Sequence, residues 1–171
     1  MKFRELTADE IECRIQSVGK MGVQLLLYKN ARCDMQILDE SVGTFGWQRE
    51  HYECKGNLFC RVGIYNDLTK EWIWKADCGA ESNVEKEKGE SSDSFKRACT
   101  NFGIGRSLYT SPKIMIWTTA KDGTPNAVVK DGKCYDKFVV EKIAYADGKI
   151  TGLAIKNASL DGKRVFVWKA E

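Results

Sequence analysis

The sequence is poor in the residues that build metal and redox sites. It has one histidine, His51, and its seven cysteines include no C-x-x-C pair. Structural zinc sites need clustered cysteines and histidines, and thiol redox motifs need two cysteines close in sequence. The sequence therefore predicts neither kind of site. Several cysteines stand inside apolar patterns, which is typical of small buried side chains in a reducing cytosol.

Long apolar runs are also absent. No segment has the roughly 20 consecutive apolar residues that cross a bilayer. The first ten residues, MKFRELTADE, lack the apolar core of a secretory signal. We therefore expect a cytoplasmic protein with no membrane partner. A G-x-x-x-x-G-K-[ST] loop is missing too, so we expect no ATP site and no cofactor.

A strong net charge is the third absence. The chain of 171 residues carries a formal charge of only +3. Residues 1–112 have 16 Lys and Arg against 17 Asp and Glu, whereas residues 113–171 have 11 against 7. Any phosphate contacts in the first part must therefore come from local clustering of cations and not from a general positive field.

Helical and strand patterns alternate through the first two thirds of the chain. Thr7 and Glu10 form a capping box, and apolar residues follow it at helical spacing, so a first helix is predicted at 8–18. The later patterns predict a strand at 23–28, a helix at 31–42, strands at 47–55, 58–65 and 71–78, an exposed charged loop at 81–90, and then another helix. The expected fold class is α+β, with an antiparallel β-β-β-α core whose helix packs on the sheet.

The last third of the chain has the pattern of β-hairpins. Asp-Gly pairs, which favour tight turns, recur at Asp122, Asp131, Asp147 and Asp161 between strand-like runs. We expect residues 113–171 to be a β-hairpin-rich extension of the same domain, whose core is 1–112. Three of these pairs continue as D-G-K, which superficially matches half of a nuclease metal site, but the turn interpretation is preferred.

The segment Ser91–Tyr109, SSDSFKRACTNFGIGRSLY, predicts an amphipathic helix with a basic face. One stripe of the helical wheel is apolar and comprises Phe95, Ala98, Cys99 and Phe102. The opposite side is polar and comprises Lys96, Arg97, Thr100 and Asn101. Such a helix can pack its apolar side on a sheet and present its cationic side to an anion.

These motifs resemble the Rad52/22 family of single-strand annealing proteins, in particular its short phage-borne members. The resemblance rests on the order D-C-G-A-E-S, S-D-S-F-K-R-A and F-G-I-G-R-S-L-Y, with N-A-R-C-D-M-Q-I-L-D-E-S-V-G and T-F-G-W-Q upstream. It covers about Leu6 to Tyr109. It implies a protein that binds single-stranded DNA, forms homo-oligomeric rings or filaments and needs no cofactor. A host or phage single-strand-binding protein is a candidate partner.

The resemblance also implies which residues bind DNA. Lys96 and Arg97 match the Lys-Arg pair that lines the family's DNA groove, and Thr100 stands where eukaryotic members have a third cation. Arg32 matches a basic groove residue, although an ordinary exposed helix position explains it equally well. Arg106 is either a phosphate ligand or an interface residue. The family's outer DNA site is doubtful here because Glu85 stands near an expected lysine, for which Lys86 and Lys88 could substitute.

Four aromatic residues could stack on bases, but packing in the core or at an interface is the preferred interpretation. They are Trp47, Trp72, Trp74 and Tyr109. A protein that anneals strands must leave the Watson–Crick edges free, which gripping phosphates achieves. The expected function is therefore ATP-independent annealing in recombination and double-strand break repair. The alternatives are a nucleic-acid-binding module that does not anneal and, less favoured, a metal-dependent recombination nuclease.

Overall fold

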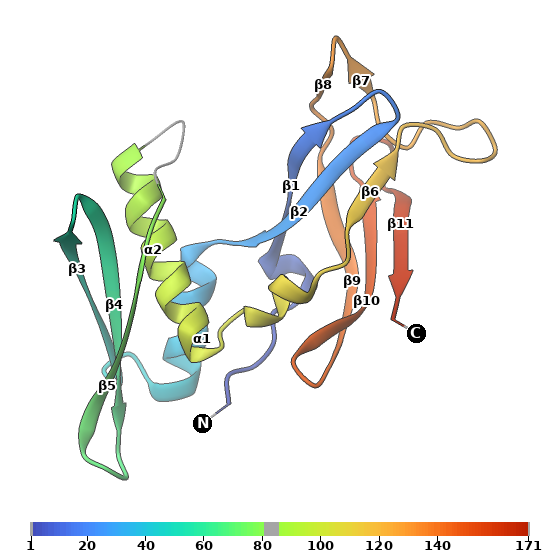
Figure 1. The fold of residues 1–171 in the computed structure, drawn as a ribbon. Helices are drawn as coiled ribbons and strands as arrows, with labels where there is room; N and C mark the ends of the chain where they lie inside the picture. Colours follow the sequence, from blue (N-terminus) through green and yellow to red (C-terminus); the bar gives the residue numbers. More distant parts are fainter. Residues whose placement is uncertain (1, 81–85, 171) are drawn as a thin grey trace. The chain divides into compact units, whose positions relative to one another are not determined.

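The computed structural model describes residues 2–80 and 86–170, and the side chains of residues 86–88 lie outside the described part. The chain divides into two compact units, each assembled from separate segments. Unit 1 comprises residues 1–5 and 29–106, and unit 2 comprises 6–28 and 107–171. Unit 1 is thus inserted between two parts of unit 2. Figure 1 shows the course of the chain through these segments by its colours.

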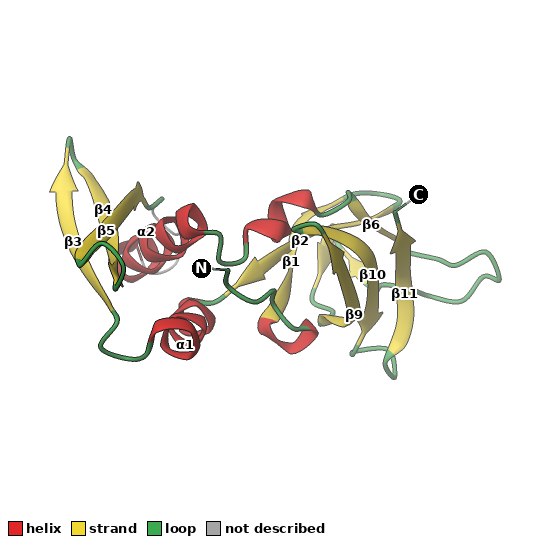
Figure 2. Cartoon of the chain, turned by 90° about the horizontal axis from the view of Figure 1, so that it is seen from below, coloured by secondary structure: helices red, strands yellow, loops and turns green. Residues whose placement is uncertain are grey.

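Unit 1 is a three-stranded antiparallel sheet with two helices on one face. Its elements are α1 (Ala31–Val42), β3 (Trp47–Cys54), β4 (Asn57–Asn66), β5 (Glu71–Cys78) and α2 (Lys86–Phe102). The strands lie in the order β3-β4-β5, and α2 packs across β4 and β5 while α1 contacts β3 and α2 (Figure 2). The predicted β-β-β-α core and the α+β class are confirmed. The predicted loop at 81–90 is wrong for residues 86–90, which are helical, and residues 81–85 lie outside the described part.

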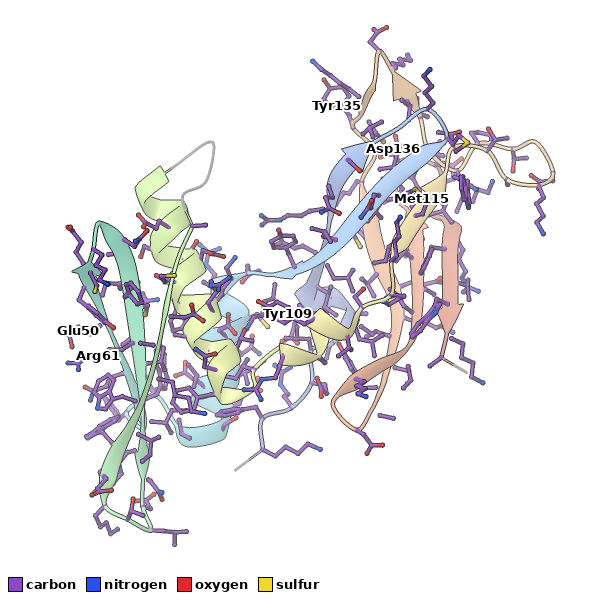
Figure 3. All side chains as sticks on the ribbon, viewed as in Figure 1. Glu50, Arg61, Tyr109, Met115, Tyr135 and Asp136 are labelled. Carbon is purple, nitrogen blue, oxygen red and sulfur yellow. The ribbon has the colours of Figure 1, made fainter. Side chains whose placement is uncertain are left out.

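The alternation of side chains along β4 explains the two faces of this sheet. Cys60, Val62 and Ile64 are buried on the helix side. Arg61 lies between them in sequence, points to the other face and pairs with Glu50 of β3. Figure 3 shows both residues on the side of the sheet away from α2. The core of unit 1 therefore lies between the sheet and the helices.

Unit 2 is built around a six-stranded sheet that curves until its edge strands come into contact. Its order is β11-β10-β9-β1-β2-β6, and β6 contacts β11. The bounds are β1 (Ile11–Val18), β2 (Gly22–Lys29), β6 (Ile114–Trp117), β9 (Phe138–Ala146), β10 (Lys149–Asn157) and β11 (Lys163–Lys169). A small hairpin of β7 (Val129–Lys130) and β8 (Lys133–Cys134) precedes β9. Two 3-10 turns, η1 (Ala8–Glu10) and η2 (Arg106–Thr110), complete the chain, with Arg106 the last residue of unit 1.

The predicted helix at 8–18 is wrong. The capping box of Thr7 and Glu10 is present, but it begins only the short turn η1, after which the chain is the strand β1. The apolar residues Ile11, Cys13 and Ile15 alternate with exposed polar residues, which is the two-residue period of a strand. Two isoleucines also favour an extended backbone, because their branched side chains lose freedom in a helix.

The Asp-Gly pairs form tight turns, as predicted. Asp131, Asp147 and Asp161 all have φ of 50°, and each is followed by a glycine that also has positive φ. Two consecutive residues with positive φ are typical of the turn that matches the twist of a hairpin. The D-G-K triplets are therefore turn sequences.

Candidate nucleic-acid interface

The apolar stripe of α2 holds this helix on the sheet. Phe95, Ala98 and Cys99 are fully buried, and Trp47 of β3 stacks on Phe95 with ring centroids 6.0 Å apart. Burial raises the pKa of the Cys99 thiol, so this cysteine serves as a small core side chain. On the polar side of α2, Arg97 and Asn101 contact Asp77 of the edge strand β5, so they lie on the flank of the helix beside this strand. The predicted apolar stripe is confirmed for Phe95, Ala98 and Cys99, while Phe102 is half-buried.

The two predicted groove cations differ in their exposure. The side chain of Arg97 is 47% exposed, and its Nε lies 3.2 Å from Oδ1 of Asp77 on β5. The side chain of Lys96 is only 16% exposed, and its Nζ lies 3.8 Å from Oδ1 of Asp93. Lys96 is therefore more enclosed than the mobile charge expected from the sequence. Arg97 is the more accessible of the two, and its planar guanidinium suits a phosphate.

Thr100 directs its hydroxyl to its own helix. Its Oγ1 donates to the backbone carbonyl of Lys96 at 3.0 Å. A threonine in a helix commonly makes this bond, since the carbonyl four residues earlier is within reach. The hydroxyl of Thr100 could donate to a phosphate only if it released the carbonyl of Lys96 or if the helix backbone changed its conformation.

Arg106 binds the C-terminal end of α2. Its guanidinium donates to the carbonyl of Thr100 at 3.1 and 2.9 Å and to that of Asn101 at 2.9 Å. The last carbonyls of a helix lack partners and carry partial negative charge, which a cation neutralises. This side chain is nevertheless exposed. The structure therefore gives Arg106 a capping contact, which the sequence analysis did not predict.

Arg32 lies in the first turn of α1. Asn30 caps this helix through its side-chain oxygen, which accepts hydrogen bonds from the backbone N–H groups of Arg32 and Cys33. The Arg32 side chain is exposed.

Lys86 and Lys88 lie in the first turn of α2, but their side chains are outside the described part, as is Glu85. The structure thus describes Arg32, Lys96, Arg97, Thr100 and Arg106 of the predicted set.

A buried ion pair, which the sequence analysis missed, lies where α1 meets α2. Lys29 donates through Nζ to Oδ1 of Asp34 and, at 2.8 Å, to the carbonyl of Ile104. Asp34 is completely buried, and its Oδ2 has no hydrogen-bond partner among the described residues. Gly105 lies against the stem of Lys29 with φ of +65°, and a Cβ there would come within 2.8 Å of the lysine Cδ. This pair fixes the start of α1 to the segment that leaves α2.

Burial dominates the electrostatics of Asp34. It raises the pKa of this carboxyl to about 6, an effect opposed by the charge and hydrogen bond of Lys29 and, more weakly, by the charge of Lys96. A sequence signal for Asp34 did exist. The residue stands at i−3 and i−4 from the buried Ile37 and Leu38, so an acid occupies the inward stripe of α1.

The aromatic residues weighed as base-stacking candidates have separate environments. Trp47 packs on Phe95, and its Nε1 donates to Asp39 at 2.7 Å. Trp72 and Trp74 lie on the outer face of the β3-β4-β5 sheet, each 37% exposed. Tyr109 is 73% exposed. Trp47 thus packs in the core, whereas Trp72 and Trp74 contact each other on the outer face with ring centroids 6.2 Å apart.

The described residues form neither a metal site nor a membrane-spanning helix. No three His, Cys, Asp or Glu side chains of the described part gather as metal ligands. Among the described helices, none combines the length and apolar character that crossing a membrane requires.

Unit 1 has the features of a class of protein in which a helix packed on a three-stranded sheet carries cations on its polar face, here the partly exposed Arg97 and the more enclosed Lys96. Such a face is suited to binding a polyanion. Comparison with protein families makes the assignment specific. The chain belongs to the Rad52/22 family of double-strand break repair proteins, whose model matches residues 3–127. No curated protein and no solved structure matches the chain. Proteins of this family act in DNA repair and recombination by annealing strands, and the resemblance seen in the sequence is confirmed.

Proposed function

We propose that this protein binds single-stranded DNA through the phosphate backbone and promotes annealing of complementary strands without ATP. The proposal rests on two facts about α2: the helix lies within the region that matches the family, and it has one buried apolar side and one polar side with cations. The matched region contains the whole helix, and the helix buries its apolar stripe while Arg97 is exposed on the other side.

The chemistry of the polar face supports contact with phosphates. Arg97 and Lys96 each lie beside a carboxylate at distances of 3.2 and 3.8 Å, so a phosphate would compete with Asp77 and Asp93 for these cations. The Arg97 side chain is 47% exposed, and an ion pair at an exposed side chain contributes little stability, so exchanging Asp77 for a phosphate costs little; Lys96, only 16% exposed, is less accessible. Contacts to phosphates carry no base information, so binding is expected to be independent of sequence. The base edges stay available to a second strand.

Annealing by this route requires no covalent step. Two strands repel each other through their phosphates, and aligned cations reduce that repulsion. A homo-oligomer, ring or filament, would align many copies of α2 along one strand. We therefore include self-association in the proposal, with single-stranded DNA as the principal partner and a single-strand-binding protein as a further one. Native mass measurement with DNA present should show a species of several chains.

An annealing assay tests the function directly. Two complementary oligonucleotides, one carrying a fluorophore and the other a quencher, are mixed with the protein in a buffer that contains a chelator and no ATP. The proposal predicts that fluorescence falls faster with protein than without it, and that added ATP has no effect. Arg97→Ala should slow the reaction.

Arg61→Ala is the matched control for this assay. The Arg61 side chain is 45% exposed and pairs with Glu50, as Arg97 pairs with Asp77, but it lies over the Trp74 ring on the opposite face of the sheet. Equal slowing by both variants would contradict a role for α2. Binding of single strands without faster annealing would identify a non-annealing module. Loss of labelled DNA that depends on magnesium would indicate a nuclease instead.

A further inference from the structure

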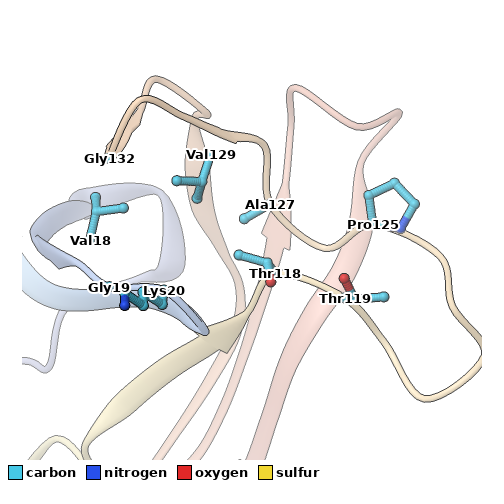
Figure 4. Close-up of a pocket in the computed structure, with 9 residues that line it drawn as sticks. All are labelled: Val18, Gly19, Lys20, Thr118, Thr119, Pro125, Ala127, Val129 and Gly132. Carbon is cyan, nitrogen blue, oxygen red and sulfur yellow. The ribbon is translucent and has the colours of Figure 1, made fainter.

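Unit 2 has a cleft at one end, which we call the loop cleft. It encloses about 600 Å³ and is lined by the β1–β2 turn, the segment after β6 and the β7–β8 hairpin (Figure 4). The lining residues include Lys20 from the first of these, Thr119 and Pro125 from the second, and Val129 and Gly132 from the third. All belong to unit 2, whereas α2 belongs to unit 1.

Four lysines in these same loops have no partner in the described part of the chain. Lys20 lines the cleft, Lys121 lies between Thr119 and Pro125, and Lys130 and Lys133 belong to the β7–β8 hairpin. All four are exposed. No hydrogen bond or ion pair within the described residues engages them, so the fold alone does not account for their charges.

The hairpin pair is unfavourable for folding. Lys130 and Lys133 stand directly opposite each other across the Asp131-Gly132 turn. Like charges in this position repel and destabilise a hairpin. A bound anion between them would remove the repulsion, which makes this pair the clearest indication of a ligand.

Three neighbouring charged groups, Asp122, Asp136 and Lys163, are by contrast engaged in the fold. Asp122 accepts from the backbone N–H and the hydroxyl of Thr124 at 2.9 and 2.6 Å. Asp136 accepts from the N–H of Val128 and from Asn157 Nδ2, both at 2.8 Å. Lys163 donates to the carbonyl of Pro125 at 3.0 Å. Asp122 and Asp136 are thus satisfied by the protein, whereas Asp131 lies in the turn between Lys130 and Lys133 and offers one negative charge against these two positive ones.

The charge of the whole sequence is concentrated in the same unit. Unit 2 has 13 Lys and Arg against 10 Asp and Glu, whereas unit 1 has 14 of each. The net charge of +3 therefore resides in unit 2. A polyanion is the partner that this distribution favours.

An exposed aromatic residue adjoins the lysine hairpin. Tyr135 follows β8 directly and is 82% exposed, and Figure 3 shows it beside Asp136 at the β8 end of unit 2. A free aromatic ring next to a cationic pair is the combination that binds single strands, in which the cations bind phosphates and the ring stacks on a base. Duplex DNA offers phosphates but no unstacked base.

We propose that the loop cleft is a second binding site for single-stranded DNA, in which Lys20, Lys121, Lys130 and Lys133 contact phosphates and Tyr135 stacks on a base. The choice of DNA over other polyanions rests on the proposed function. The hairpin and Tyr135 lie beyond residues 3–127, so the family match does not imply this site. Each chain then contacts DNA twice, once through α2 and once through unit 2.

Equilibrium binding of a fluorescein-labelled oligothymidine, measured by anisotropy across a salt series, tests the proposal. Lys130→Ala/Lys133→Ala should weaken binding and make the slope of log affinity against log salt shallower by about 1.4, because each phosphate contact on a single strand contributes about 0.7. Tyr135→Ala should weaken binding roughly tenfold with the slope unchanged, and Tyr135→Phe should restore it. The lysine variant should unfold at the wild-type temperature or above it, since a repulsion has been removed.

The matched control is Lys142→Ala/Lys149→Ala. Lys149 also follows an Asp-Gly turn, but that turn joins β9 to β10 and lies at the other end of the strands (Figure 1). If this control lowers the slope as much as the hairpin variant, general charge explains the effect and the proposal fails. If the hairpin variant binds like the wild type while Arg97→Ala is weakened, the loop cleft is not a DNA site and the proposed function stands. If the wild type does not bind oligothymidine, the proposed function fails as well.

Discussion

At the scale of single residues, the buried pair of Lys29 and Asp34 stands out because a charge inside a protein is costly. Removing one partner of a buried pair typically destabilises a protein by about 3–5 kcal/mol, since the other charge is left without compensation. Here the pair also connects the start of α1 to the end of α2 through the carbonyl of Ile104. Arg32 lies in the first turn of α1, so the pair helps to set the position of the helix that carries it.

Asp34 should give the protein a distinctive dependence of stability on pH. Its pKa is raised from 3.8 to about 6, so the folded protein holds this proton more tightly than the unfolded chain. The stability that the neutral carboxyl contributes is therefore fully present below about pH 4 and is lost as the pH rises through about 6. Across this window the free energy of unfolding of the wild type should fall relative to that of Asp34→Asn, by on the order of 3 kcal/mol.

Denaturant titrations of both proteins between these pH values provide the measurement. Asp67→Asn, at a carboxylate whose side chain is 88% exposed, gives the baseline. The charged or titratable groups that face Asp34 are Lys29 from β2 together with Lys96 and Cys99 from α2. If the wild type instead gains stability relative to Asp34→Asn as the pH rises, the attraction of Lys29 outweighs burial and this interpretation of the pair is wrong.

At the scale of elements, α2 is held at its C-terminal end by contacts that can be tested separately from DNA binding. Arg106 donates to two terminal carbonyls of this helix. Arg106→Ala should lower the free energy of unfolding by about 1 kcal/mol, because those carbonyls lose a charged partner. Urea titration measures this, and Arg106→Lys should recover part of the loss. An unchanged stability would show that the capping contact contributes nothing and would return Arg106 to the candidate phosphate ligands.

The elements also show which local signals decide structure in this sequence. The strands β3, β4 and β5, the helix α1 and the apolar stripe of α2 follow from periodicity and turn residues, and they were predictable. The strand β1 was not, because Ile11 and Ile15 fit both a helical and an alternating pattern and the capping box favoured the helix. Cys13 resolves the ambiguity once it is counted as apolar, since its side chain is half-buried in line with the two isoleucines.

At the scale of the whole molecule, the order of segments in the sequence does not match their grouping into the two units, because each unit is assembled from separate segments. Residues 6–28 pair with strands more than 80 residues later, as the register of Glu12 with Val139 illustrates. Local periodicity carries no information about such pairing, so the two units could not be found from the sequence. The proposed site on α2 could be predicted because its residues lie within one helix. The loop cleft could not be predicted, because it combines turns that are distant in sequence.

The central claim is that α2 binds the phosphates of single-stranded DNA. The salt dependence of binding tests this claim most directly. The affinity of the wild type, Arg97→Ala and Arg61→Ala for an oligothymidine is measured across a series of salt concentrations. We predict that Arg97→Ala weakens binding and makes the slope of log affinity against log salt shallower by about 0.7, the value for one lost phosphate contact. Arg61→Ala should match the wild type in both respects. If Arg97→Ala keeps the wild-type affinity and slope, this face of α2 is only a solvated surface and the account is contradicted.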